Sequence, residues 1–404
     1  MRPKFLTAKN FILLLLAVTI FSALAMWIKN GMPLPGRAIP STAGKIAFVS
    51  TRNGSPDIWM MDGADGGNAV ALTDNDEDAE DRAPAWSETG SEIAFVSGGR
   101  KGVTPQIFRM DAEANAKILQ VTNTSSSKYA PKYGPENNLY FLDTGKLVSY
   151  NIIANDATAI LPSADLRLAM SSYLEKGGFE RYDVSPDGQR YLAVLNIEEG
   201  KALTLFVPSE QALVLLGVAE DIYARFTPDG GFVVAYISGS PSNQAVPMIT
   251  PEMLEQPAFT PIPLSQFRPP TDRTIIVRYN ADLSPNGTPQ AVPAPPDEVV
   301  FSPDVSMMVM AYSNELEDMK GLIIAPVDNL GQAQLVFDQP AGSVSWSPDG
   351  QKIAFVHNDD IYVGTASTGE VKNLTNGQGA SSNPVWSPAQ PKEGQAAGST
   401  AAKP

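Results

Sequence analysis

A short phrase recurs along this chain: an aromatic or apolar residue, Ser or Thr, Pro-Asp-Gly, and then an apolar run. Complete copies begin at Val184, Phe226 and Trp346, and looser copies begin at Trp86, Tyr133, Phe301 and Trp386. Repetition at a period of about 40–50 residues is typical of propellers and solenoids, because one small sheet cannot bury its own faces and stacks on its neighbours. The phrase therefore limits the chain to a repeat architecture.

Each copy of the phrase predicts a tight β-hairpin. Pro sets the backbone for the first central position of a turn, and Gly takes the left-handed position that closes it. The runs that follow, such as residues 46–49 and 93–96, are apolar without alternation. A strand of that kind must be covered on both faces, as in the middle of a propeller blade.

The two ends of the repeat region complement each other. Residues 44–49 supply a second strand with no first strand before it, and residues 383–388 supply a first strand with no partner after it. Joined, they complete one blade. The sequence therefore predicts an all-β fold, a single β-propeller of about seven four-stranded blades whose C-terminal strand closes the ring. The long interval between Phe226 and Phe301 leaves six or eight blades open.

The N-terminus resembles a membrane signal. Arg2, Lys4 and Lys9 precede an uncharged apolar stretch at 11–28, which reaches the length of about 18–20 residues that spans a bilayer. Because positive residues stay on the cytoplasmic side, we expect the propeller outside the cytoplasm. Small residues at Ala23 and Ala25 leave a cleaved signal peptide and secretion open.

These features divide the chain into four parts. We expect a signal-anchor or transmembrane helix at 1–28, a flexible tether at 29–43, the propeller at 44–388 and a disordered tail at 389–404.

Composition excludes several functions. The net charge of −15, from 29 basic and 44 acidic residues, argues against nucleic acid as a partner. The chain has no Cys, and its one histidine, His357, has no nucleophile motif nearby. Residues 74–81 begin like a calcium loop but carry Ala79 and Ala85 where Gly and Glu are needed. We expect no catalytic residue, cofactor or metal.

The phrase and its flanks resemble a known family. Leu72-Thr73 before residues 83–87, and Leu374-Thr375 before residues 383–388, are similar to the WD40-like propeller repeat of the TolB family over residues 44–388. The resemblance implies the fold but little about function, because the repeat also occurs in periplasmic scaffolds, peptidase propellers and lyases. TolB itself carries an α/β domain before six blades, so its lipoprotein partnership is not carried over.

The copies also align residues at one end of the expected channel. Residues four or five before the aromatic position should begin the innermost strands, at the channel mouth. They include four carboxylates beside a cation and a phenol, namely Asp81, Glu180, Asp221, Asp297, Arg82 and Tyr129. Two interpretations stay open: polar loop starts, or an acidic mouth that binds a cationic peptide segment, an amine or a divalent ion.

A Pro-rich insertion at about 239–273 is the other distinctive segment. Its apolar side chains either pack on the propeller itself or dock a protein partner, and the candidates for docking are Met253, Leu254, Phe259 and Phe267. We therefore expect a membrane-tethered, extracytoplasmic and non-catalytic module that binds a protein or peptide. The alternative is a channel-binding enzyme or sensor for a small molecule or sugar that uses carboxylates.

Overall fold

The computed structural model describes residues 44–75, 79–100, 102–163, 177–198, 200–249, 273–292, 294–313 and 320–388. The predicted N-terminal helix at 1–28, the tether and the tail at 389–404 lie outside these residues, and so do Met253, Leu254, Phe259 and Phe267 of the insertion. Within the described ranges, no helix is long and apolar enough to cross a membrane.

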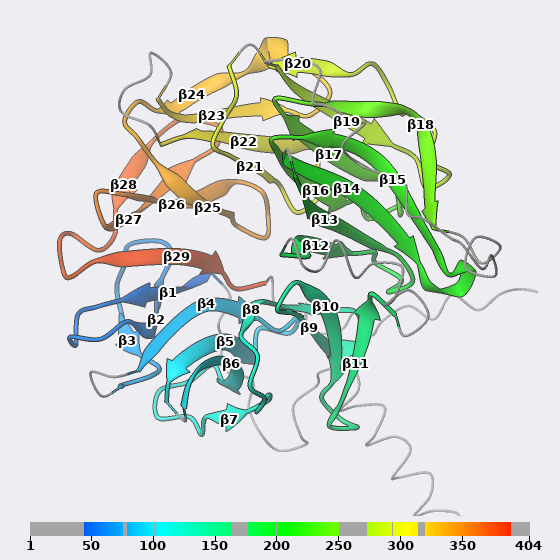
Figure 1. Cartoon of the computed structure of the whole chain (residues 1–404). Coiled ribbons are helices and arrows are strands. Elements are labelled where there is room, and N and C mark those ends of the chain that lie inside the picture. The colour runs from blue at the N-terminus through cyan, green and yellow to red at the C-terminus, as the bar shows by residue number, and fades with distance from the viewer. Residues whose placement is uncertain are drawn as a thin grey trace, which may run out of the picture.

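Seven antiparallel sheets surround one axis, which confirms the seven-bladed propeller (Figure 1). From its innermost strand outwards, blade 1 is β29 (Ser381–Trp386), β1 (Lys45–Ser50), β2 (Asp57–Asp62) and β3 (Val70–Ala71). Blade 2 is β4 (Glu80–Trp86), β5 (Glu92–Gly99), β6 (Gly102–Asp111) and β7 (Leu119–Gln120). Blade 3 is β8 (Lys128–Gly134), β9 (Asn138–Asp143), β10 (Lys146–Asn151) and β11 (Asp156–Leu161).

The remaining blades follow the same order. Blade 4 is β12 (Phe179–Val184), β13 (Tyr191–Ile197), β14 (Gly200–Val207), β15 (Ala212–Ala219) and β18 (Ser240–Ile249). Blade 5 is β16 (Asp221–Phe226), β17 (Phe232–Ile237), β19 (Thr274–Tyr279) and β20 (Gln290–Val292). Blade 6 is β21 (Glu298–Phe301), β22 (Met307–Tyr312), β23 (Gly321–Pro326) and β24 (Gln334–Phe337). Blade 7 is β25 (Gly342–Trp346), β26 (Lys352–His357), β27 (Asp360–Thr365) and β28 (Val371–Asn373). Short 3₁₀ turns lie at η1 (Pro135–Asn137), η2 (Pro208–Glu210) and η4 (Leu330–Gln332).

The recurring phrase forms the turn between the first two strands of a blade. Ser347 Oγ accepts a hydrogen bond from Lys352 N at 2.9 Å and donates to Asp349 Oδ1 at 2.6 Å. Asp349 Oδ1 also accepts from the backbone N of Gln351 at 3.1 Å, and Gly350 has a φ of +67°. The equivalent hydroxyl–carboxylate pairs are Ser185–Asp187, Thr227–Asp229 and Ser302–Asp304.

The Leu-Thr pair that ends a blade ties its outer edge to the third strand. Thr73 Oγ1 accepts from Ile58 N at 2.9 Å and donates to Asp57 Oδ1 at 3.1 Å. Thr375 repeats both bonds with Ile361 N at 2.9 Å and Asp360 Oδ1 at 2.6 Å. We call this arrangement the Asp–Thr clamp.

Ring closure occurs as the sequence predicts. β29 pairs antiparallel with β1, with Trp386 opposite Ile46 and Val385 opposite Ala47. Ser387 N donates to Lys45 O at 2.9 Å, and Lys45 N donates to Ser387 Oγ at 3.2 Å. These are the bonds that Ser347 and Lys352 make within one hairpin, so the chain ends reproduce a hairpin without a connection.

The core lies between blades rather than within them. The unbroken run in β1 explains why, since Ile46 and Phe48 pack with Ala354 toward blade 7 while Ala47 and Val49 pack toward blade 2. Both faces of the strand are buried, as expected of a run without polar alternation.

The Pro-rich insertion begins as an extra strand. β18 follows β17 of blade 5 in sequence but pairs with β15 at the outer edge of blade 4. Met248, on β18, is buried in the cluster between blades 3 and 4. Gly239 N donates to Arg273 O at 3.3 Å, so the ends of the insertion meet and blade 5 continues with β19. The described start of the insertion therefore packs on its own propeller.

Candidate functional site

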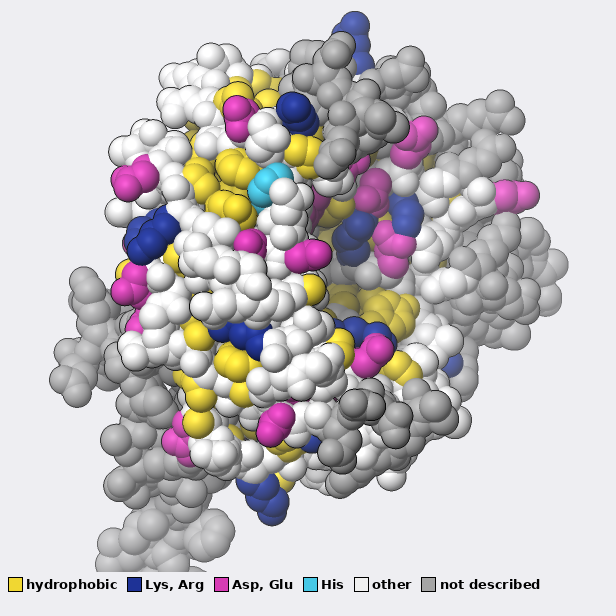
Figure 2. All heavy atoms as spheres, turned by 90° about the vertical axis from the view of Figure 1, so that its left-hand side faces the viewer, with side chains coloured by type: hydrophobic (Ala, Val, Ile, Leu, Met, Phe, Trp, Pro, Cys, Tyr) yellow, Lys and Arg dark blue, Asp and Glu magenta, His cyan; other side chains and the backbone are white. Residues whose placement is uncertain are grey.

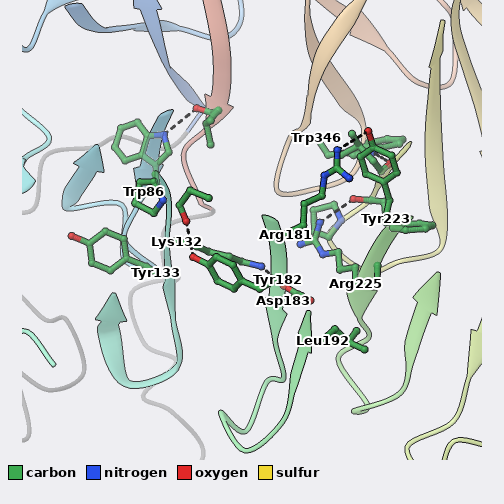
Figure 3. A pocket seen from close by; sticks show the side chains of 18 of the residues that line it. Trp86, Lys132, Tyr133, Arg181, Tyr182, Asp183, Leu192, Tyr223, Arg225 and Trp346 are labelled. Atoms are coloured by element: carbon green, nitrogen blue, oxygen red, sulfur yellow. Dashed lines mark hydrogen bonds and ion pairs between the residues drawn. The ribbon is translucent and has the colours of Figure 1, made fainter. Parts of the chain in front are cut away.

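A cavity of about 710 Å³ lies on the axis of the ring and is lined by the innermost strands of all seven blades. Its wall is rich in aromatic side chains, namely Trp86, Tyr133, Tyr182, Tyr223, Phe301, Trp346 and Trp386 (Figure 3). Two of them also join neighbouring blades, because Trp86 Nε1 donates to Val385 O at 3.0 Å and Trp346 Nε1 to Val300 O at 2.9 Å. The aromatic position of the phrase thus builds the channel wall and locks the blades around it.

Four innermost strands bend at the same place. The residue three before the aromatic has a left-handed backbone in β4, β8, β25 and β29, at Ala83, Ala130, Ser343 and Asn383. In each case the pairing with the second strand shifts register there. Such bulges bend a strand and re-aim its side chains. β16 and β21 pair without a shift, so blades 5 and 6 form a straighter part of the wall.

The wall carries charged side chains as well. Arg181 Nη1 forms an ion pair with Asp221 and lies 3.1 Å from Glu180 Oε1, and its guanidinium stacks 4.4 Å above the ring of Tyr223. Lys201 forms a second ion pair with Glu180. Burial alone would lower the pKa of Arg181, but Asp221, Tyr223 and Glu180 together raise it. The guanidinium is therefore held as a fixed cation at the start of β12.

A second charged group lies further along the same strands. Lys132 of β8 forms an ion pair with Asp183 of β12, and Asp183 Oδ2 accepts from Phe226 N at 2.8 Å. Arg225 of β16 donates through Nη1 to Phe301 O at 2.9 Å. None of the ion pairs found among the described residues involves Arg225. Blades 3, 4 and 5 thus present a cation, a carboxylate and a cation in turn.

The end of the channel where the innermost strands finish has a different character. The residue after Ser in the phrase lines the cavity there in four blades, as Glu88, Pro303, Pro348 and Pro388. This rim is apolar except for Glu88, which stands where the other three blades have Pro. Figure 2 shows the opposite face, where the innermost strands begin; it is hollowed, with apolar side chains at the floor and acidic and basic side chains close together around the hollow.

The predicted channel residues occupy the end where the innermost strands begin. Glu180 lines the cavity, and Arg181 brings it together with Asp221. Asp297 accepts from Ser313 N and Ser313 Oγ at 2.6 and 2.8 Å, and its backbone O accepts from Tyr223 Oη at 2.9 Å. These three residues therefore share one corner, beside blades 4 to 6.

The other three predicted residues lie apart from that corner. Asp81 is fully buried and bonds Arg100 Nη2 at 2.7 Å, while exposed Arg82 lies 3.8 Å from Glu80. Tyr129 Oη donates to Phe179 O at 3.2 Å and accepts from Gly145 N at 2.8 Å, which joins blades 3 and 4. All four predicted carboxylates have donors of their own in the chain. The acidic mouth stays a prediction.

Sequence reasoning missed Lys132, Arg181 and Arg225, although they line the cavity. A signal for two of them was present, because Lys132 and Arg225 directly precede the aromatic residue of the phrase. Alternation along a strand turns that position away from the blade core and toward the axis. Arg181 lies at a register shift in β12, which spacing alone does not reveal.

Two further features bear on chemistry. His357 ends β26, packs edge-on against Phe337 and Tyr362, and does not line the cavity. Across the described ranges no group of three or more His, Cys, Asp or Glu side chains is placed to hold a metal ion.

Comparisons with known proteins support the fold. The family model of the dipeptidyl peptidase IV (DPP IV) N-terminal region matches residues 318–385, from the third strand of blade 6 to β29. No curated protein matches the chain. A prolyl endopeptidase structure is similar with a TM-score of 0.52 and 12% identity, over 84% of this chain and 49% of that one.

Two other solved structures match the chain with lower TM-scores. Oligogalacturonate lyase from Vibrio parahaemolyticus has a TM-score of 0.50 and 10% identity, over 82% of this chain and 85% of that one. TolB from Acinetobacter baumannii has a TM-score of 0.45 and 16% identity, over 87% of this chain and 68% of that one. The chain is a β-propeller, and it spans about half of the prolyl endopeptidase.

Proposed function

We propose that this protein is a non-catalytic binding module whose central channel takes a peptide segment of a partner protein. The observation that carries the proposal is the cavity of about 710 Å³, walled by aromatic side chains from all seven blades. Volumes of about 300–1,000 Å³ with apolar walls and a few convergent polar groups are typical of ligand sites. Trp and Tyr are also enriched among the residues that carry most of the binding energy at protein interfaces.

The state of two channel carboxylates, Asp183 and Glu180, argues against acid–base catalysis by that pair. Acid–base chemistry with two carboxylates needs one of them free to donate and one free to accept. Asp183 is engaged by Lys132 and by the backbone N of Phe226, and Glu180 is engaged by Arg181 and Lys201. The single histidine is packed in blade 7, away from the cavity. A binding role fits this arrangement better than the carboxylate enzyme.

The cellular location of the protein is part of the same proposal. The basic residues before the apolar stretch at 11–28 support a single-helix membrane anchor with the propeller outside the cytoplasm. The partner would then be another protein or peptide of that compartment.

The test compares a channel-filling variant with a matched surface variant. Ala85→Trp places a large side chain in the cavity, and Ala157→Trp makes the same change on the exposed outer strand β11. Full-length chains would be captured from gently solubilised membranes and their bound proteins identified by mass spectrometry. We expect a partner that both wild type and A157W retain and A85W loses.

A partner retained equally by both variants would contradict binding in the channel. Ala224→Trp, on the opposite side of the cavity, repeats the test should A85W unfold at a lower temperature than wild type.

A further inference from the structure

The channel has two different walls. The residue directly before the aromatic or apolar residue of the phrase lines the cavity in six blades. In blades 3, 4 and 5 these residues are Lys132, Asp183 and Arg225, whereas in blades 6, 1 and 2 they are Val300, Val385 and Ala85. A charged wall therefore faces an apolar wall across the same level of the channel.

The charged wall has hydrogen-bond donors to spare. Arg225 has five N–H donors, and the bond from Nη1 to Phe301 O uses one of them. Lys132 has three, and its side chain remains 47% exposed beside Asp183. Both cations lie on the cavity surface, so their unused donors can reach a group inside it (Figure 3).

The charged wall has little acceptor capacity to match. Asp183 is 8% exposed, one of its oxygens is paired with Lys132, and the other accepts from Phe226 N. Glu180, nearer the start of the strands, is shared between Arg181 and Lys201. At the charged wall, a ligand cation would have to displace Lys132 or Arg181, whereas a ligand carboxylate would bind donors that are still free.

We propose that the channel recognises a carboxylate carried by an otherwise apolar peptide segment. Arg225 and Lys132 bind the carboxylate, and the apolar side chains of the segment lie against Val300, Val385 and Ala85. Guanidinium binds carboxylate through two parallel bonds, which fixes orientation as well as adding affinity. This inference rests on the proposed function, and it specifies the charge of the ligand.

The test uses three pools of N-acetylated hexapeptides built from Leu, Val, Phe and Ser. One pool has a free C-terminal carboxylate, one has a C-terminal amide, and one has a C-terminal amide and a single Glu. Full-length protein in mild detergent is immobilised, and retained peptides are measured by mass spectrometry and fluorescence polarisation. We expect one carboxylate pool to bind about tenfold more tightly than the plain amide pool, since bonds to charged groups are worth that much.

Variants of the cations identify the group responsible. Arg225→Met should abolish the preference for a carboxylate, Arg225→Lys should retain part of it, and Lys132→Met should weaken it. Arg190→Met is the matched control, because Arg190 also bonds backbone carbonyls, those of Gly230 and Ala281, but does not line the cavity. Thermal unfolding of each variant checks that it folds.

The outcomes separate this inference from the proposed function. Equal binding of all three pools by wild type, lost in A85W, would overturn carboxylate recognition and leave channel binding intact. No retention of any pool, together with a pull-down partner that A85W keeps, would overturn both. Arg225-dependent binding of galacturonate oligomers without any peptide binding would replace the peptide by an acidic sugar and overturn the proposal. Loss of the preference in R225M but not in R190M supports it.

Discussion

Two aspartates in the same structural position have pKa values that are shifted in opposite directions. Asp57 and Asp360 are the acceptors of the Asp–Thr clamps in blades 1 and 7. Burial raises the pKa of Asp57 to about 6. The hydrogen bonds from Thr73 and Asn75 oppose this shift, and the negative charges of Asp81 and Asp74 add to it. Burial alone would also raise the pKa of Asp360, but bonds from Thr375, Asn373 and Gly377, together with nearby Arg52, lower it. The neighbours of the clamp therefore set its charge.

This difference predicts a pH-dependent effect of Asp57→Asn. A folded pKa of about 6, above the ordinary 3.8, means that the folded state binds the proton more tightly. The contribution of Asp57 is therefore most favourable below about pH 4 and is lost as pH rises through about 6. Asn keeps the oxygen that accepts from Thr73 and Asn75. D57N should raise the free energy of unfolding by about 1–2 kcal/mol at pH 8 and by much less at pH 5.

Asp360→Asn is the comparison for that experiment. Because its pKa is lowered, the charged form of Asp360 stabilises the fold above pH 4, and that contribution is lost as pH falls through the folded value. D360N should lower stability by about 0.5–1 kcal/mol at pH 8, since the side chain is partly exposed. Urea unfolding at pH 5 and pH 8 measures both variants. A D57N protein that loses equal stability at both values would contradict the argument.

At the scale of elements, four hairpin turns of the phrase are each held by an aspartate of their own. The Ser or Thr hydroxyl that bonds the carboxylate, with a backbone N–H two residues on, lowers the pKa of Asp187, Asp229, Asp304 and Asp349. The charged form is thus the stabilising one. This stabilisation is present above about pH 4 and is lost as pH falls through the lowered folded value.

Asp349→Ala tests the turn in one blade. It removes the acceptor for Ser347 Oγ and Gln351 N, and we expect a loss of about 1 kcal/mol in the free energy of unfolding at pH 7. The loss should shrink as pH falls below about 4 and passes through the lowered folded pKa of Asp349, where the wild-type carboxyl takes up its proton. Asp338→Ala is the matched control, because Asp338 lies in an exposed loop of blade 6 and its carboxylate accepts one long hydrogen bond among the described residues, from Gln339 Nε2 at 3.4 Å. Urea unfolding measures the free energy of unfolding of both variants. Equal losses in D349A and D338A would mean that the hydrogen bonds of the turn add no stability beyond that of an exposed aspartate.

Elements with a local cause could be predicted from the sequence. The hairpins follow from Pro-Asp-Gly chemistry, and the buried second strands follow from apolar runs. The bulges at Ala83 and Ala130 could not, because Ala has no preference for the left-handed backbone that it adopts there. Their conformation is imposed by packing around the ring. β18 was also missed, since it leaves blade 5 to pair with blade 4.

At the scale of the whole molecule, the site exists only after the ring closes. Aligning the copies predicts Glu180 as a channel residue, which the structure places in the wall. Which side chains face each other depends on strands brought together from distant parts of the chain, as when Trp86 bonds Val385 across 299 residues. The division into a charged and an apolar wall is therefore invisible in any single copy of the phrase.

Closure of the ring is itself noncovalent, which allows a direct test of how much it stabilises the fold. Ser50 of β1 and Ser381 of β29 are opposite each other, buried, and joined by a hydroxyl–hydroxyl hydrogen bond of 3.2 Å across 331 residues. The chain has no Cys, so the double variant S50C/S381C can form only this disulfide. Linking distant residues restricts the unfolded chain, and we expect the oxidised protein to be about 2–5 kcal/mol more stable than the reduced one. Urea unfolding with and without reductant measures the difference, and the single variant S381C is the control. If the two forms are equally stable, with the disulfide verified on a non-reducing gel, separation of β29 from β1 does not govern unfolding. A large difference would identify the contact between β29 and β1 as the place where the propeller opens.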